Sequence, residues 1–382
     1  MCRVTTPPPD ELRRDFLLDP EVAFLNHGSF GACPRPVFES YQAHQRDLEL
    51  EPIDFLDRRL PALLASARTE LARYLNAPPS DLAFVINATT GVNLAARSLD
   101  LRPGDEVLTT DLEYGACDLA WEWLVARTGA VYVRAPIPLP LESPAALVEA
   151  LFARATERTR VVYVSHITSS TALVLPVDEI VARANELGLV TIVDGAHAPA
   201  YVPVDVEALG ADFYAGNTHK WLIAPKGAGF LHARPEHQER VDAAIVSWGY
   251  AEGRDFQERI EMQGTRDPAA WLAVPDAIRY QAERDWDAGR ERCRALTRAA
   301  RAELCDLLGT EALAPEEMLG QMASIRLPRS DPGLRDRLFV NHRVEIPVTR
   351  PDRDLLRISV AAYTTRDDID RLLVALAREL DA

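Results

Sequence analysis

The sequence predicts an α/β protein, with a large domain whose mostly parallel sheet lies between helices and a smaller C-terminal α+β domain. Seven short apolar runs rich in β-branched residues alternate with helical stretches between residues 83 and 232. Such alternation is typical of βαβ units whose parallel sheet is covered on both faces. Beyond residue 268 the pattern changes to two long helical stretches, short strands and a closing helix. At 382 residues, the chain has room for two or three domains.

The predicted elements follow in chain order. Residues 1–25 form an N-terminal arm, 26–268 the large domain and 269–382 the small domain. Helical spacing of apolar residues predicts helices at 36–50, 61–74, 91–99, 117–126, 145–155 and 177–187. Strands are predicted at 83–87, 106–109, 130–134, 161–165, 189–193, 213–216 and 228–232. In the small domain, helices at 270–285 and 290–308 precede strands at 323–327, 344–348 and 355–360 and a helix at 366–380.

Composition excludes several classes of partner. The net charge is −16, from 42 basic and 58 acidic residues, and no basic run is present, which argues against nucleic acid or an anionic membrane. No apolar run approaches the ~18 residues of a spanning helix, and the first residues show no apolar signal segment. The five cysteines form no CxxC pair, which fits a reducing compartment. We therefore expect a cytoplasmic protein that acts on a small molecule.

A lysine and an aspartate form the strongest chemical signal. Lys220 stands in Asn217-Thr218-His219-Lys220-Trp221 between two apolar runs, and Asp194 ends the strand predicted at 189–193, 26 residues earlier. A surface lysine and a helix-capping aspartate are the alternative interpretations. A lysine amine can form an imine with an aldehyde, and a carboxylate beside a pyridine nitrogen keeps that ring an electron acceptor. The pair therefore predicts pyridoxal 5'-phosphate (PLP) as cofactor.

A phosphate site is predicted where the strand at 83–87 turns into a helix. The segment Asn87-Ala88-Thr89-Thr90-Gly91 offers backbone N–H groups and two hydroxyls, which suit a phosphate at a helix N-terminus. It lacks the spaced glycines of a P-loop or a dinucleotide site. The eight histidines show no metal-ligand spacing, so no metal site is predicted. Ser29 begins no GxSxG turn, which disfavours a serine hydrolase.

Together these motifs resemble the class V aminotransferase family of fold-type I PLP enzymes, and within it the isopenicillin N epimerase-like group. The resemblance runs from residue 25 to residue 365 and therefore covers nearly the whole chain. The matching segments are LNHGSFGACPRPV (25–37), NATTGVN (87–93), DLEYGACDLAW (111–121), SHITSSTALVLPV (165–177), DGAHAP (194–199), GNTHKW (216–221), QGTRDPAAW (263–271) and RISVAAYTT (357–365).

The resemblance implies a role for each cofactor-binding residue. Lys220 corresponds to the lysine that carries PLP, and Asp194 to the partner of the pyridinium. His197 corresponds to a residue placed against the ring hydroxyl, and Tyr114 to the aromatic residue stacked on the ring, although Tyr114 could also be an ordinary core tyrosine. The phosphate cradle implied in this way comprises Ala88, Thr89, Thr90, Thr218 and His219.

The resemblance also implies a substrate site and a dimer. Arg357 matches the arginine that clamps the substrate carboxylate, for which a planar guanidinium is suited; a lone arginine in a short strand would otherwise be a surface residue. Asn26 and His27 lie in a segment that faces the substrate, although His27 may equally serve the turn. Gly264 and Thr265 match a loop that reaches the phosphate of the neighbouring subunit's cofactor, which implies a homodimer.

The leading hypothesis for the reaction is epimerisation or racemisation of an amino acid. It removes a proton on one face of the α-carbon and returns one on the other. Lys220 is one acid/base, and the second could be Tyr114, His27 or a water. A C–S β-lyase needs no second base and is the first alternative, and an aminotransferase the next. A non-catalytic PLP-binding protein is disfavoured by the set of functional residues.

A persulfide-forming cysteine desulfurase is disfavoured, because such enzymes carry a nucleophilic cysteine shortly before the carboxylate-binding arginine. The stretch 340–357 contains no cysteine, and Cys293 and Cys305 lie in the preceding helical region. The loops 26–31, 248–256 and 342–350 are expected to line the pocket for the substrate's side chain.

Overall fold

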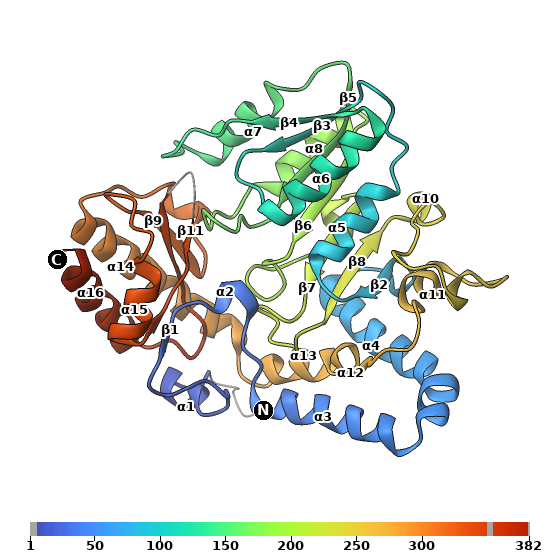
Figure 1. The fold of residues 1–382 in the computed structure, drawn as a ribbon, viewed down its shortest axis with the longest axis horizontal. Coiled ribbons are helices and arrows are strands. Elements are labelled where there is room, and N and C mark those ends of the chain that lie inside the picture. The colour runs from blue at the N-terminus through green and yellow to red at the C-terminus, as the bar shows by residue number, and fades with distance from the viewer. Residues whose placement is uncertain (1–5, 350–353, 381–382) are drawn as a thin grey trace.

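A seven-stranded sheet forms the centre of the molecule (Figure 1). The structure, a computed structural model, describes residues 6–349 and 354–380, so residues 1–5 of the predicted arm and residues 350–353 and 381–382 of the predicted small domain lie outside it. The strand order is β2-β8-β7-β6-β5-β3-β4. Strands β3 to β7 run parallel to one another, and β8 runs antiparallel to both of its neighbours. The bounds are β2 (Leu82–Val85), β3 (Glu106–Thr110), β4 (Val131–Ala135), β5 (Thr159–Ser165), β6 (Val190–Gly195), β7 (Phe213–Asn217) and β8 (Gly229–Ala233).

Helices cover both faces of this sheet, which confirms the predicted α/β class. Helices α5 (Ala88–Arg97) and α6 (Gly115–Thr128) pack on one face, and α7 (Pro144–Phe152) and α8 (Val177–Glu186) pack on the other. Successive side chains of a strand point to opposite faces. Accordingly, Ile192 of β6 joins the core beneath α5 and α6, whereas Val193 joins the core on the other side.

The predicted helix at 270–285 is wrong as a single element. It consists of α12 (Ala269–Leu272) and α13 (Val274–Ala282), with Pro275 in the first turn of α13. Proline has no backbone N–H and is tolerated in a first turn but not in a helix interior. Both pieces pack against α3 (Arg35–Leu50) and α4 (Leu60–Leu75), and α3 is followed by a π-helical segment, Asp54–Arg59. The predicted domain limits at 25 and 268 stay predictions.

The C-terminal part is built on a three-stranded antiparallel sheet, β11-β12-β9. Its strands are β9 (Met322–Arg326), β11 (Val348–Thr349) and β12 (Leu355–Ser359), and α14 (Trp286–Leu308) packs on β9 and against α16 (Arg366–Leu380). The strand predicted at 344–348 is in fact two short ones, because β10 (Val344–Glu345) leaves this sheet and pairs in parallel with β1 (Ala23–Phe24). The N-terminal segment is thereby joined to the C-terminal part.

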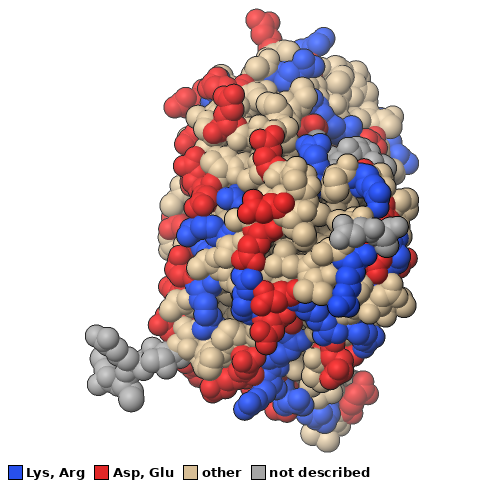
Figure 2. Space-filling model, turned by 90° about the vertical axis from the view of Figure 1, so that its left-hand side faces the viewer, with Lys and Arg blue, Asp and Glu red and all other residues tan. Residues whose placement is uncertain are grey.

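Helix α15 (Leu334–His342) was not predicted. Only Leu334 and Leu338 of this helix are buried, whereas Phe339 and Val340 are exposed, so its apolar residues form no clear stripe. Arg337 on α15 pairs with Asp331 and Glu379, both at 2.6 Å. Figure 2 shows acidic and basic side chains interspersed on the face that carries the C-terminal part. Within residues 6–349 and 354–380, no helix is both long and apolar enough to cross a membrane.

Candidate active site

A cavity of about 380 Å³ lies at the carboxyl ends of the central strands. This is where side chains meet in an open parallel sheet. Six of the predicted site residues line the cavity: Thr89, Tyr114, Asp194, His197, His219 and Lys220. Other predicted residues, Asn26, His27, Ala88, Thr90, Thr218 and Arg357, are not among its lining residues.

Asp194 is the second-last residue of β6 and is paired there with Ala215 of β7. Its carboxylate accepts the backbone N–H of Ala196 at 2.9 Å, the thiol of Cys117 at 3.6 Å and the hydroxyl of Tyr163 at 3.5 Å. Burial raises the pKa of Asp194 from its ordinary value, although the positive charge of Lys220 opposes this shift. The site thus holds a buried carboxylate that forms no direct ion pair with any described residue.

Lys220 follows β7 and faces the same cavity. Burial and the positive charge of Arg357 lower the pKa of the Lys220 amine to about 8. Its Nζ lies 3.1 Å from Nε2 of His197, and the Nδ1 atom of His197 accepts the indole N–H of Trp221 at 3.3 Å. A lysine with a pKa near neutrality can serve as a nucleophile or a base.

The segment before α3 packs against the backbone of Lys220. Gly31 has φ of +68°, and a Cβ atom there would lie 2.2 Å from the His219 carbonyl oxygen and 2.8 Å from Cα of Lys220. Only glycine fits both this conformation and this close approach. The first turn of the segment, α2 (His27–Phe30), brings Ser29 to the cavity.

His27 is held behind the lysine and not in the cavity. Its Nε2 lies 3.1 Å from the backbone oxygen of Lys220, which can only accept, so this nitrogen carries the proton. Its Nδ1 then accepts the hydroxyl of Tyr363 at 2.8 Å. Burial and the nearby Lys226 lower the pKa of His27 to about 3. Both ring nitrogens are therefore occupied, and neither is free to take a proton from a substrate.

At the N-terminus of α5, two of the first three backbone N–H groups are already used. Asn217 accepts from Ala88 N at 2.8 Å, and Asn87 accepts from Thr90 N at 2.8 Å and from the Thr90 hydroxyl at 3.1 Å. Thr90 thus caps its own helix, which the sequence did not indicate. Thr89 lines the cavity with no such bond to its backbone N–H or hydroxyl, and remains free for a ligand.

Two further groups beside this helix end lack partners. The hydroxyl of Thr218 is buried without a hydrogen bond to any described residue. His219 donates through Nδ1 to the backbone oxygen of Ala228 at 2.8 Å, which leaves Nε2 available in the cavity lining. Burial lowers the pKa of His219 to about 4. A buried donor without a partner costs free energy unless a ligand satisfies it.

Arg357 on β12 has no carboxylate partner among the described residues, although it is only 3% exposed. Its guanidinium donates to the backbone oxygen of Ser169 at 2.5 Å and to the hydroxyl of Ser29 at 3.0 Å, and Nε has no partner. Both serines line the cavity. Burial lowers the pKa of Arg357 to about 10. Asn26 contributes to the Arg357 site indirectly. Its side chain accepts a hydrogen bond from the Ser29 hydroxyl at 2.5 Å and donates one to Glu345 at 2.9 Å.

Tyr114 stands at the start of α6, is 44% exposed and borders the cavity. The residue before it, Glu113, is a buried acid that sequence reasoning did not single out. Its carboxyl group accepts the hydroxyl of Thr110 and both the backbone N–H and the hydroxyl of Ser165, at 2.6 to 2.8 Å. Burial raises the pKa of Glu113 to about 8. These bonds join the ends of β3 and β5 beneath Tyr114.

Gly264 and Thr265 do not reach the Lys220 cavity within one chain. They are exposed and border a separate cavity of about 410 Å³ with Leu56, Trp248, Arg266 and other residues. The role implied for them requires a second copy of the chain.

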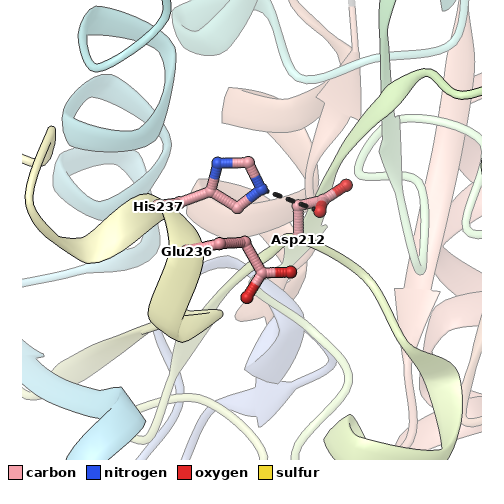
Figure 3. Close-up of side chains that lie close together, drawn as sticks. All are labelled: Asp212, Glu236 and His237. Atoms are coloured by element: carbon pink, nitrogen blue, oxygen red, sulfur yellow. Dashed lines mark hydrogen bonds and ion pairs between the residues drawn. The ribbon is translucent and has the colours of Figure 1, made fainter.

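One group of metal-ligating residue types lies together in the part of the chain that the structure describes. Asp212 precedes β7, and Glu236 and His237 come from α10 (Pro235–Gln238) (Figure 3). His237 bonds to Asp212 at 2.9 Å, and the other oxygen of Asp212 accepts the backbone N–H and hydroxyl of Thr191. These bonds account for the cluster as a link between β6, β7 and α10.

Comparison with known proteins agrees with this geometry. The chain is 41% identical to isopenicillin N epimerases of Amycolatopsis lactamdurans (95% of this chain, 96% of the relative) and Streptomyces clavuligerus (96% and 97%). It is 31% identical to putative L-cysteine desulfhydrase 2 of Oryza sativa subsp. japonica (96% and 87%).

Solved structures share the fold. A cysteine desulfurase of Escherichia coli aligns with a TM-score of 0.83 at 23% identity, over 99% of each chain. The cystine C–S lyase C-DES in complex with cysteine persulfide aligns with a TM-score of 0.80 at 24% identity, over 94% of this chain and 98% of that one. The aminotransferase class-V model matches residues 54–372. The predicted family and cofactor are thereby confirmed: the chain belongs to the aminotransferase class-V family, whose enzymes use pyridoxal 5'-phosphate.

Proposed function

We propose that this protein is a PLP-dependent amino-acid epimerase or racemase, with the cofactor on Lys220 and the substrate carboxylate on Arg357. The observation that carries the proposal is the buried guanidinium of Arg357, which lacks a carboxylate partner and is held by two serines of the cavity lining. A buried charge is costly unless it is paired. An amino-acid substrate would supply the missing anion.

The residues present fit PLP at both ends. Asp194 is a buried carboxylate without a direct ion pair among the described residues, as a pyridinium partner would be. At the other end, the free donors at Thr89 and Thr218 suit a phosphate at a helix N-terminus. His219 borders the same end, where its neutral ring offers Nε2 only as an acceptor. His197 lies between these ends beside Lys220.

When bound, PLP supplies an electron-accepting ring that stabilises negative charge at the α-carbon of an amino acid. The chain supplies the rest of the chemistry. Arg357 orients the substrate through its carboxylate, since a guanidinium pairs with a carboxylate in a fixed plane. Lys220 Nζ takes the α-proton, and a pKa of about 8 keeps part of this amine neutral at physiological pH. Asp194 would keep the ring nitrogen protonated and therefore positively charged.

Inversion at the α-carbon needs a second group that returns a proton on the opposite side. We propose Tyr114 for this role, because it borders the cavity and is accessible to solvent. His27 is less suited, because Lys220 and Tyr363 occupy both of its nitrogens. A water held at Tyr114 would serve equally.

A C–S β-lyase is the second candidate, favoured by the 31% identity to a putative L-cysteine desulfhydrase. It requires Lys220 and Arg357 in the same roles and no second base. Aminotransfer is the third. Persulfide formation is disfavoured, because burial raises the pKa of every thiol that the structure describes. Cys117, Cys293 and Cys305 are buried, and Cys33 is partly buried.

We also propose a homodimer in which Gly264 and Thr265 of each chain complete the phosphate site of the other. Within one chain they line another cavity and not that of Lys220, which supports this arrangement.

The reaction can be tested with the cofactor-loaded protein and single amino acids in deuterated water. Deuterium at the α-carbon together with inversion would support the epimerase. Formation of pyruvate with sulfide or a persulfide would show that the enzyme is a lyase instead. Formation of a keto acid with pyridoxamine phosphate would show that it is an aminotransferase. Borohydride reduction should attach the cofactor to Lys220, and attachment to another lysine would overturn the site assignment.

A further inference from the structure

One imidazole beside the cavity has a hydrogen-bond partner at each of its ring nitrogens. The indole Nε1 of Trp221 lies 3.3 Å from Nδ1 of His197, and Nζ of Lys220 lies 3.1 Å from Nε2. His197 and Trp221 are each 3% exposed. An indole N–H can only donate, so Nδ1 of His197 accepts and carries no proton.

The proton of His197 therefore sits on Nε2. Burial, together with the positive charges of Lys220 and Arg357, lowers the pKa of His197 well below its ordinary value, so the ring is neutral. A neutral ring has one N–H and one lone pair. With the lone pair on Nδ1 used by Trp221, the remaining N–H on Nε2 is directed at Lys220.

The position of the His197 proton affects whether Lys220 is a neutral amine or an ammonium. A neutral Lys220 amine has a lone pair that can accept from Nε2, whereas an ammonium has only donors. A protonated Lys220 would need Nε2 as acceptor, which would move the imidazole proton to Nδ1. That proton would then face the indole N–H, and the hydrogen bond from Trp221 would be lost.

We propose that Trp221 is a positioning residue that holds His197 in the Nε2–H tautomer and thereby favours the neutral amine of Lys220. The inference rests on the proposed function only in taking Lys220 as the lysine that binds the cofactor and moves the α-proton. Trp221 itself is not among the residues that line the cavity.

The indole is held in place by its surroundings. Its ring packs against Tyr201 and His27, with centroids 4.8 Å apart in both cases. The side-chain amide of Gln281 donates to the backbone oxygen of Trp221 at 2.9 Å. The indole N–H thus has a fixed direction, which a tautomer lock requires.

Other charged or titratable groups also act on Lys220. Arg357 disfavours the ammonium, and Asp194 and Cys117 favour it. His219, the next residue in the chain, has its Nδ1 proton committed to Ala228 and stays neutral. Trp221 differs from all of these, since it carries no charge and acts only through the position of the His197 proton.

The test replaces the indole by a ring without an N–H, Trp221→Phe. In the full chain freed of cofactor, the rate of PLP capture is followed by absorbance from pH 6 to 10, because only the neutral amine attacks the aldehyde. The wild-type profile should turn near the Lys220 pKa of about 8. Loss of one net hydrogen bond should move the variant's profile up by about half to one pH unit. Capture at pH 7 should fall about threefold to tenfold.

Trp271→Phe is the matched control. Its indole donates at 3.1 Å to the backbone oxygen of Val85 and not to His197, so its loss should leave the profile in place. A Trp221→Phe profile that coincides with the wild type would overturn the proposal. So would a control variant that shifts by the same amount.

A measurement on the unmutated chain decides the question even if Trp221→Phe does not fold. Nitrogen-15 NMR of histidine-labelled protein, with and without cofactor, reports the tautomer of each ring, and His197→Gln identifies the relevant signal. Protonated Nε2 is expected, and protonated Nδ1 would refute the lock. If borohydride labels Lys220 while the tautomer is wrong, only the role of Trp221 fails; if another lysine is labelled, the proposed function fails.

Discussion

The side-chain oxygen of Asn217 accepts a hydrogen bond from the backbone N–H of Ala88 at 2.8 Å. This bond joins the end of β7, the strand that leads to Lys220, to the first turn of α5. Both groups are buried, and the two residues are 129 positions apart in the chain. The bond therefore sets where the free donors of Thr89 stand relative to Lys220.

Asn217→Ala should weaken PLP binding, because the first turn of α5 loses its anchor and Ala88 N–H loses its partner. Affinity should fall about threefold to tenfold, as expected for one net hydrogen bond. Quenching of protein fluorescence by added PLP would measure it. Asn185→Ala, which removes an exposed bond to Gly210 at 3.3 Å, serves as control. Equal PLP affinities for wild type and Asn217→Ala would contradict the prediction.

Arg357→Met should abolish amino-acid binding and leave the folded protein equally or more stable. The variant removes a buried cation that has no carboxylate partner, and such charges are costly. Arg357→Lys should bind amino acids better than the Met variant but on the order of a hundredfold more weakly than wild type, because lysine lacks the planar fork. Substrate titration and thermal unfolding should be measured on one preparation. A large loss of stability in Arg357→Met, with normal binding in the folded fraction, would mean a structural role.

Cofactor-free Lys220→Met should be more stable than the wild type at neutral pH. The Lys220 pKa falls from 10.5 in the unfolded chain to about 8 in the folded one, so the unfolded state binds more protons between these values. The buried amine therefore costs stability below pH 8, and this cost disappears as the pH rises through 10.5. The gain should be on the order of 2–4 kcal/mol at pH 7. Urea unfolding at pH 7 and pH 10.5 would measure this gain in the free energy of unfolding. A gain that does not depend on pH would contradict a lowered pKa of Lys220.

Gly264→Val should disturb the cofactor site of the other subunit. Gly264 has φ of +107°, which a β-branched residue adopts only with strain. We expect weaker PLP binding and dissociation of the dimer at higher protein concentration than for wild type, since ligand and assembly are linked. Sedimentation with and without PLP measures both. An active wild-type monomer saturated with PLP would exclude the dimer model.

A mixing experiment sharpens this prediction. Heterodimers of Lys220→Ala and Gly264→Val chains carry one site with both lesions and one site with neither, if the loop serves its neighbour. Activity after mixing should then exceed the sum of the two separate preparations, because one site of each heterodimer is intact. No recovery in verified heterodimers would place the loop's effect within its own chain.

The sequence by itself determined the α/β class and the cofactor, and it singled out a lysine and an aspartate that line one cavity. These follow from short-range signals: apolar runs of strand length, helical spacing between them, and polar residues directly after a strand. Parallel strands end at one edge of the sheet, so Asp194 near the end of β6 and Lys220 after β7 meet there. The break at Pro275 was also readable, since proline is tolerated only in a first turn, whereas α15 lacked a clear apolar stripe.

Only the tertiary structure decided which polar groups are left without partners. Arg357 comes from β12, and its lack of a carboxylate depends on Ser29 and Ser169, which are 328 and 188 positions away. His27 has both nitrogens occupied by residues that no local pattern connects to it. Glu113 and Trp221 lay within recognised motifs, but their bonds depend on which strands and loops are neighbours. Hydrogen bonding and burial set these protonation states, and both arise from contacts between segments far apart in the chain.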